Sequence, residues 1–529
     1  MAFFHVEPVY LGLLIGLLIG AFLQLHLKRR SKSALPYPPG PRPLPIIGNI
    51  LDLSSSFQWR TFIEWTVKYD SDILHFTIGG SSTIVLNSLE AANELLEKRG
   101  KIYSSRPQFP MLNFIGWDWT FVIMPYGSRW SAHRKLFTKE FNPNLPERYE
   151  PQELRVVATL LERLLQTPED FVDHIRHARG AAIMDVTYGI KVLPYNDPYI
   201  NEAERALESF VAAAIPGSFW LDFFPGLKHI PEWFPGASFK TKAKKWRREA
   251  SIMLNHPYED VKKRVANGEL EACYVYHCLQ NIDENGDIEL QERDIQQTAG
   301  TMYGAGSDTI IASIRSFFLA MVLNPEVQRK AQKHLDEMIN LKLKHGHLDN
   351  DNPNRLPNFS DRDLLPYITA IMYEVYRTQP VNPLGIAHMC EVDDEYKGYY
   401  IPKNSVVIAN IWGIFRDEKT YPEPNKFNPD RWMSSDGKSL NPNLREPVMH
   451  FGYGRRLCPG RHLANAAIWI TIASVLFAFD ISKAVDEHGN VIEPTGEYIS
   501  SLVNYPAPFR CKIKARSEQH ERLIRSSVV

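Results

Sequence analysis

The feature that most constrains this chain is the segment 451–460, which reads Phe-Gly-Tyr-Gly-Arg-Arg-Leu-Cys-Pro-Gly. A cysteine binds a metal as a thiolate, so its negative charge must be offset by N–H donors and a positive metal ion. Gly454 permits a tight turn that directs backbone N–H groups toward the sulfur of Cys458. A helical pattern, 461–479, follows at once, and its N-terminus directs a positive dipole end toward the same sulfur. The segment therefore predicts that Cys458 is a metal ligand.

The residues around Cys458 favour a flat, negatively charged cofactor. Gly460 has no side chain, so a planar macrocycle can approach closely. Phe451 can shield the sulfur from water, and Arg456 can pair with a carboxylate. The alternative is that Cys458 is only a small buried hydrophobic residue, which is the usual role of a single cysteine. The full spacing Phe-x-x-Gly-x-Arg-x-Cys-x-Gly favours the ligand.

This segment resembles the haem-binding loop of the cytochrome P-450 haem-thiolate monooxygenases. The resemblance extends from Pro36 to about Arg516 and looks eukaryotic, microsomal and fungal. It implies a mostly α-helical fold with small β-sheets, in which one large haem-binding domain follows one N-terminal transmembrane helix. It also implies haem b as the cofactor, with the Cys458 thiolate as axial ligand to the iron.

Residues 305–309 read Ala-Gly-Ser-Asp-Thr and lie within a long apolar helical pattern. They resemble a second motif of the family, the oxygen-activation motif. A glycine inside a helix costs about 1 kcal/mol relative to alanine, so Gly306 needs a reason. That reason is either room for dioxygen or close helix packing. Thr309 can bond back to the carbonyl of residue 305 or hold a water. The resemblance implies that Asp308 and Thr309 are catalytic and deliver protons.

Two further motifs concern structure and cofactor binding. Glu374 and Arg377 share a helix face, and the resemblance implies that Arg431 joins them in a buried structural ion-pair network. Tyr376, which lies between Glu374 and Arg377, stands where the family more often has leucine, and we expect no functional consequence. Trp130 and Arg134 also share a helix face.

The resemblance implies that Trp130 and Arg134 bind the haem propionates together with Arg456. His388 lies where the family often has another propionate-binding residue. A loop histidine with only structural contacts is an equally good interpretation of His388.

The N-terminus carries a membrane signal. Residues 9–27 are 19 residues without a formal charge, and as a helix they would extend about 28 Å, close to the ~30 Å of a bilayer core. The basic cluster 28–32 follows, which places this flank in the cytosol. We therefore expect a lumenal N-terminus (1–8), an anchor (9–27) and a basic, proline-rich linker (28–48). The monooxygenase domain (49–516) and a C-terminal tail (517–529) would follow, with the protein in the endoplasmic reticulum membrane as a single-pass chain.

The body of the chain reads as one large, mostly helical unit. Helices are predicted at 89–99, 153–165, 292–323, 326–343, 363–377 and 464–479, and strands at 73–78, 83–87 and 405–409. Lys plus Arg number 60 and Asp plus Glu 61, and this balance argues against a nucleic-acid partner. Five cysteines are typical of a reducing compartment.

The resemblance implies insertion of one oxygen atom from O2 into a C–H bond. The chain has no flavin or nicotinamide fingerprint, so the electrons would come from NADPH through a membrane-bound flavoprotein reductase. Basic residues near the cysteine are candidates for its docking surface: Lys135, Lys139, Arg455 and Arg461. A haem-thiolate isomerase or dehydratase and a non-enzymatic haem sensor are the alternatives. Retention of Asp308 and Thr309 argues against both.

The substrate is less constrained by the sequence. The segment 210–235 is rich in aromatic residues, and in the family it lies between helices that cover the pocket and touch the membrane. This suits a lipophilic small molecule, such as a terpenoid, polyketide or indole-type fungal secondary metabolite. Packing in the protein core is the alternative explanation for these aromatic residues: Phe219, Trp220, Phe223, Phe224, Trp233 and Phe234.

Overall fold

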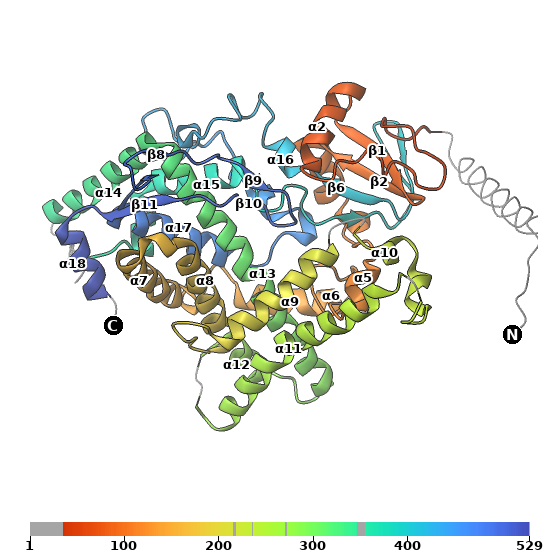
Figure 1. The fold of residues 1–529 in the computed structure, drawn as a ribbon, viewed down its shortest axis with the longest axis horizontal. Coiled ribbons are helices and arrows are strands. Elements are labelled where there is room, and N and C mark those ends of the chain that lie inside the picture. The colour runs from red at the N-terminus through yellow and green to blue at the C-terminus, as the bar shows by residue number, and fades with distance from the viewer. Residues whose placement is uncertain (1–34, 215–217, 235, 270–271, 346–354, 528–529) are drawn as a thin grey trace, which may run out of the picture.

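The computed structural model describes residues 35–214, 218–234, 236–269, 272–345 and 355–527. Helices form most of the molecule, and a small β-rich corner holds the start of the described chain (Figure 1). The expectation of a mostly α-helical fold with small sheets is therefore confirmed. The predicted lumenal segment, anchor and first part of the linker lie outside the described residues.

The helices differ widely in length, and the longest is α13, which runs through the middle of the fold (Figure 1). The helical elements are α2 (Gln58–Tyr69), α3 (Leu89–Ala92), α4 (Gly100–Tyr103), α5 (Pro110–Phe114), α6 (Ser128–Glu140), α7 (Glu150–Gln166), α8 (Phe171–Tyr188), α9 (Pro198–Ala214), α10 (Trp220–Phe223), α11 (Ser238–Ala266), α12 (Tyr274–Leu279), α13 (Ile288–Leu323), α14 (Pro325–His345), α15 (Pro366–Thr378), α16 (Ile411–Ile414), α17 (Arg461–Ala478) and α18 (Glu518–Ser527).

Within the described residues, the strands form four small sheets. The largest has the order β1-β2-β6-β3, in which β2 and β6 are parallel and the other neighbours antiparallel. The others have the orders β11-β7-β8, β10-β9 and β4-β5. The strands are β1 (Ile73–Ile78), β2 (Ser81–Leu86), β3 (His388–Met389), β4 (Asp394–Tyr396), β5 (Tyr399–Ile401), β6 (Val406–Ala409), β7 (Phe479–Val485), β8 (Val491–Ile492), β9 (Tyr498–Ile499), β10 (Tyr505–Pro506) and β11 (Cys511–Ala515).

Most predicted elements are present, with two corrections. The predicted helix 89–99 is α3 followed by a π-helical turn, Asn93–Lys98. The predicted helix 363–377 is interrupted, because Pro366 cannot continue a helix that precedes it. A 3₁₀ turn ends at Leu364, and α15 begins at Pro366, where the missing N–H costs nothing.

Helix α13 begins where Asp287 accepts a hydrogen bond from the N–H of Leu290, at 2.9 Å, and it ends before Pro325. Together with α17 it is long and apolar enough to cross a membrane, but within the described part of the chain most of both apolar stretches is buried in the protein. Both are therefore core helices. Two large apolar clusters meet along α13: one contains α7, α15 and α17, and the other α6, α8, α11 and α12.

The C-terminus differs from the expected tail. Residues 518–527 form α18, which packs on α7 and α17. Ile524 is fully buried in the main apolar cluster, and the ring of His520 meets Phe477 edge-on at 4.9 Å. One apolar face on an otherwise polar helix is enough to hold the segment against the body.

Candidate active site

The loop that carries Cys458 is held by backbone contacts. Gly454 has a φ of +53°, and a Cβ there would lie 2.4 Å from the carbonyl oxygen of Leu96, so only glycine fits. Its N–H donates to the carboxylate of Glu97 at 2.7 Å. The N–H of Cys458 donates to the carbonyl of Phe451 at 2.9 Å, which closes the loop. Helix α17 begins three residues after Cys458.

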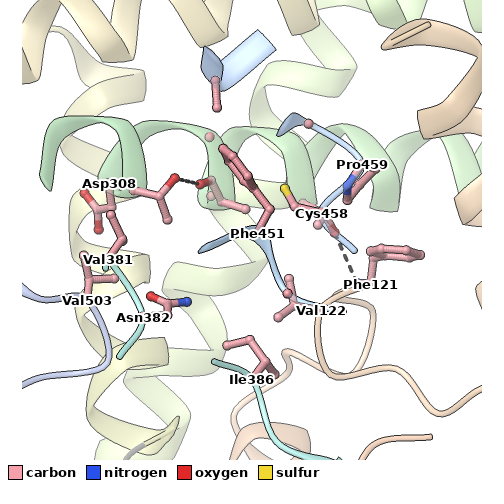
Figure 2. A pocket seen from close by; sticks show the side chains of 18 of the residues that line it. Phe121, Val122, Asp308, Val381, Asn382, Ile386, Phe451, Cys458, Pro459 and Val503 are labelled. Atoms are coloured by element: carbon pink, nitrogen blue, oxygen red, sulfur yellow. Dashed lines mark hydrogen bonds between the residues drawn. The ribbon is translucent and has the colours of Figure 1, made fainter. Parts of the chain in front are cut away.

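Several groups act on the thiol of Cys458, which lines a deep cavity beside Phe451 (Figure 2). Burial raises the pKa of this thiol, while the N–H of Gly460 and the charges of Arg134 and Arg461 lower it. The protein alone thus only partly compensates a thiolate. A metal cation at the sulfur would supply the remaining positive charge.

Helix α13 contributes to the lining of the same cavity, through Asp308 and Thr309 among others. The hydroxyl of Thr309 donates to the carbonyl of Ala305 at 2.9 Å. This is the hydrogen bond to the preceding helical turn that the sequence analysis gave as one option. Burial raises the pKa of Asp308, and a hydrogen bond from Tyr505 lowers it. The Tyr505 hydroxyl also donates to the backbone carbonyl of Asp308 at 3.1 Å. The structure therefore places a buried carboxyl and a hydroxyl in the same cavity as Cys458.

Gly306 packs against a neighbouring helix. A Cβ at this position would lie 2.8 Å from the terminal methyl of Ile183 on α8. The missing side chain therefore lets α13 and α8 approach closely, which supports the packing explanation for this glycine. Gly306 also contributes to the cavity lining.

Arg456 and Trp130 are stacked. The guanidinium of Arg456 lies 4.7 Å from the centre of the Trp130 ring and donates to the carbonyls of Ser104, at 2.5 Å, and Met124, at 2.7 Å. Arg134 donates to the carbonyl of Leu457 at 2.6 Å. Arg456 is part of the cavity lining, Trp130 lies against its guanidinium, and Arg134 contacts the cysteine loop.

Two more basic residues line the same cavity. His388 is buried, and its Nδ1 donates to the carbonyl of Tyr103 at 2.8 Å. Burial and the nearby charge of Arg106 hold the pKa of His388 well below its usual value. Arg106 is buried as well and donates to the carbonyls of Val122, Ile386 and Ala387. Sequence reasoning missed Arg106, because an arginine before a proline carries no spacing signal.

The three predicted structural residues do meet. Glu374 and Arg377 are both fully buried and form two hydrogen bonds of 2.8 Å. Arg431 adds a third at 3.2 Å. The carboxylate also accepts from the indole of Trp432 at 2.9 Å and from the backbone N–H of Asn428 at 2.8 Å. Trp432 was missed by the sequence analysis, although it directly follows Arg431.

Tyr376, the departure from the family pattern, packs beneath the cysteine loop. Its ring stacks on His450 with 4.2 Å between the ring centres and meets Phe451 edge-on at 5.5 Å. Its hydroxyl donates to Asn465 on α17 at 2.9 Å. Tyr376 therefore connects α15 to the loop and to α17.

The aromatic segment after α9 is not explained by core packing. Four of its side chains are strongly exposed, Trp233 most of all at 80%; the others are Trp220, Phe224 and Phe234. Phe210, which lies before this segment on α9, lines the cavity. Phe219 packs edge-on against Trp246 at 5.9 Å.

The comparisons with known proteins agree with this geometry. The Cytochrome P450 family model matches residues 38–512. Cytochrome P450 monooxygenase 98 of Postia placenta is 44% identical over 94% of both chains. Cytochrome P450 monooxygenase ple1 of Rhodocybe pseudopiperita is 40% identical over 99% of this chain and 98% of its own. Tryptamine 4-monooxygenase of Psilocybe cyanescens is 39% identical over 96% of this chain and 98% of its own.

A chain with this fold and this cysteine-lined cavity is a haem-thiolate monooxygenase. It belongs to the cytochrome P450 family, and the similar proteins named above are fungal.

The residues around the cavity fit a haem. Among the described residues, the indole N–H of Trp130 and one guanidinium nitrogen of Arg456 are buried without a hydrogen-bond partner. Unpaired buried donors are costly, so these two predict an acceptor that arrives with a ligand, such as a carboxylate. A Cβ on Gly460 would project into open space. The cavity lining thus combines a thiol with the guanidinium of Arg456, and this set fits a haem with two propionates.

Proposed function

We propose that the chain uses NADPH, through a membrane-bound flavoprotein reductase, to hydroxylate a lipophilic small molecule of fungal secondary metabolism. A single observation carries the proposal: Cys458 and the Asp308–Thr309 pair line the same, mostly apolar cavity. When bound, haem would supply the activation of dioxygen for this chemistry. The class is a terpenoid, polyketide or indole-type compound. One similar protein is named a tryptamine 4-monooxygenase, which is consistent with the indole option.

The proposed roles of the cavity residues follow from their positions. Cys458 would hold the haem iron through its thiolate. Because Gly454 and Gly460 have no side chains, the loop can turn tightly and the cofactor could approach it closely. Phe451 packs beside the sulfur. The unpaired donors of Arg456 and Trp130 would bind the haem propionates, together with His388. Arg134, which donates to the Leu457 carbonyl, would also assist at the propionates.

Asp308 and Thr309 are proposed to hold and deliver protons. Burial keeps the pKa of Asp308 raised, so its carboxyl can carry a proton nearer to neutral pH than an exposed aspartate can. The Thr309 hydroxyl, which donates to the Ala305 carbonyl, still has lone pairs that can accept from a water. An isomerase or a sensor would have no use for this pair, and this supports the monooxygenase over both alternatives.

The chain is proposed to be held at the endoplasmic reticulum by residues 9–27, with its catalytic domain in the cytosol. The exposed aromatic side chains around α10 would add a second contact with the lipid surface, since tryptophan favours the membrane interface. Lys135, Lys139 and Arg455 are exposed. With Arg461 they would receive an acidic reductase surface.

The test of the ligand is Cys458→Ser. The purified wild-type protein should give the red-shifted carbonyl spectrum of a reduced haem-thiolate, and Cys458→Ser should lose it because a neutral hydroxyl cannot replace the thiolate. Cys511→Ser, a change at a cysteine in β11, should leave the spectrum unaltered. A wild-type spectrum in Cys458→Ser would refute the ligand. Substrate consumption that needs NADPH and reductase would separate the monooxygenase from an isomerase.

A further inference from the structure

Asn382 is a polar residue in a part of the cavity lining that is otherwise apolar. Its side chain lies among Val381, Val503 and Ile386, and one end of the amide points into the cavity (Figure 2). Which atom occupies that end decides what the cavity offers to a substrate. The two ends of an asparagine amide have the same shape, so hydrogen bonding must decide between them.

The hydrogen-bond partners determine the orientation. With its nitrogen directed away from the cavity, the amide donates to the carbonyl of Leu502 at 3.0 Å and to that of Val381 at 3.1 Å. The opposite orientation, drawn in Figure 2, would set the amide oxygen against these two carbonyl oxygens. Two satisfied donors are preferred over acceptor–acceptor contacts. The Oδ1 atom of Asn382 therefore faces the cavity.

The backbone around this acceptor is held in place. The N–H of Gly385 donates to the carbonyl of Asn382 at 2.9 Å, and the N–H of Asn504 donates to the carbonyl of Val381 at 2.8 Å. A carboxamide oxygen has two lone pairs, and one that is fixed toward the cavity is ready to bind a donor from a ligand at little conformational cost.

We infer that Asn382 orients the substrate by accepting a hydrogen bond, through its Oδ1, from a hydroxyl or N–H group of an otherwise lipophilic molecule. The inference rests on the proposed function and narrows its substrate class. A pure hydrocarbon would leave Oδ1 unpaired in an apolar surrounding, which a donor-bearing molecule avoids. Asn382 is thus a specificity-determining residue, distinct from the proton-delivering pair on α13.

The test uses ligands that bind a haem iron through one common end. The haem-loaded protein is titrated with 1-(ω-hydroxyalkyl)imidazoles of increasing arm length, and with 1-alkylimidazoles of the same number of heavy atoms. The haem absorption reports each dissociation constant. For each protein, the ratio of the two dissociation constants gives its preference for the hydroxyl ligand over the alkyl ligand. At the arm length that reaches Oδ1, this preference should be about threefold to tenfold larger in the wild type than in Asn382→Leu, which is the effect of one net hydrogen bond.

The pairing of ligands separates recognition from structural damage. A variant that only disturbs the cavity weakens the binding of both ligands of a pair equally, and this result would overturn the inference. The inference would also be overturned if wild type and Asn382→Leu showed the same preference for the hydroxyl ligand at every arm length. Asn382→Ala is a second variant that also removes the acceptor, and it should lose the same preference. Ile386→Val, at a neighbouring apolar lining residue, should retain it. If the wild-type protein binds no haem, no ligand changes the absorption spectrum. That result would refute the proposed function, and it is distinguishable from a failure of the inference about Asn382.

Discussion

Glu374 shows how much one residue can organise. Its carboxylate accepts hydrogen bonds from the side chains of Arg377, Arg431 and Trp432 and from the backbone of Asn428. Arg377 in turn donates to the carbonyls of Phe415, Pro424 and Lys426. The pair thus ties α15 to the long segment that leads to the cysteine loop, with every charge satisfied in a buried setting.

We predict that Glu374→Ala destabilises the protein strongly. The change leaves the fully buried Arg377 without its carboxylate, and breaking a buried pair costs about 3–5 kcal/mol. Haem content per protein and the midpoint of urea unfolding measure the effect, and both should fall sharply. Glu521→Ala is the control, because Glu521 pairs with Arg525 on the exposed face of α18. It should cost about 0.3–0.5 kcal/mol. Wild-type stability of Glu374→Ala would show that the network carries little energy.

At the scale of elements, α13 depends on close contacts at its glycines. A Cβ on Gly300 would lie 2.8 Å from a methyl of Leu254 on α11 and 3.1 Å from the ring of Trp119. A Cβ on Gly304 would lie 3.1 Å from Met253, also on α11. These positions let a helix of 36 residues pass through the fold with neighbours on several sides.

Gly300→Val should therefore lower the free energy of unfolding. The rigid Trp119 ring cannot move aside as easily as a methyl group, and overpacking costs about 1–3 kcal/mol. Urea unfolding measures the change. Arg293→Val introduces the same residue on the exposed face of α13 and should remain within about 0.5 kcal/mol of wild type. If Gly300→Val and Arg293→Val lowered the free energy of unfolding equally, helix propensity and not packing would explain the effect.

At the scale of the whole molecule, exposed apolar side chains gather in two segments. Leu44, Ile46 and Leu51 precede α2, and Trp220 and Trp233 flank the turn after α10. Both segments lie on the same side of the view in Figure 1, near the start of the described chain. This is the side on which an N-terminal anchor would hold the protein against a bilayer.

We predict that deletion of residues 1–27 leaves haem binding intact but releases part of the protein from membranes. Adding Trp220→Ser and Trp233→Ser to the truncated chain should then lower vesicle binding at least about tenfold, since each buried aromatic side chain is worth about 1.5–3 kcal/mol. Sedimentation with phosphatidylcholine vesicles measures binding. Tyr195→Ser, at a residue that is 77% exposed outside these segments, is the control. Unchanged binding of the double variant would exclude this surface as a lipid contact.

The sequence by itself determined the features that depend on local spacing. The spacing around Cys458 predicted a turn, a ligand and a following helix, and the structure has the turn and the helix. Glu374 and Arg377 lie three residues apart within one helix, where the helical repeat alone decides that their side chains share a face. Asp308 and Thr309 are adjacent in the sequence, so their proximity was also fixed locally. The long apolar pattern of α13 predicted the central helix to within a few residues. The local features of the fold and most of the candidate site were therefore predictable.

Only the tertiary structure decided the contacts between distant segments. Arg106 joins the cavity from a segment far from the cysteine loop in sequence, Trp432 completes the bonds of Glu374, and Trp130 meets the guanidinium of Arg456. Partners so far apart are brought together by packing of whole elements, which no short-range pattern encodes. The same holds for the exposed aromatic segment and for Asn382, whose orientation depends on the carbonyl of Leu502, 120 residues further along the chain.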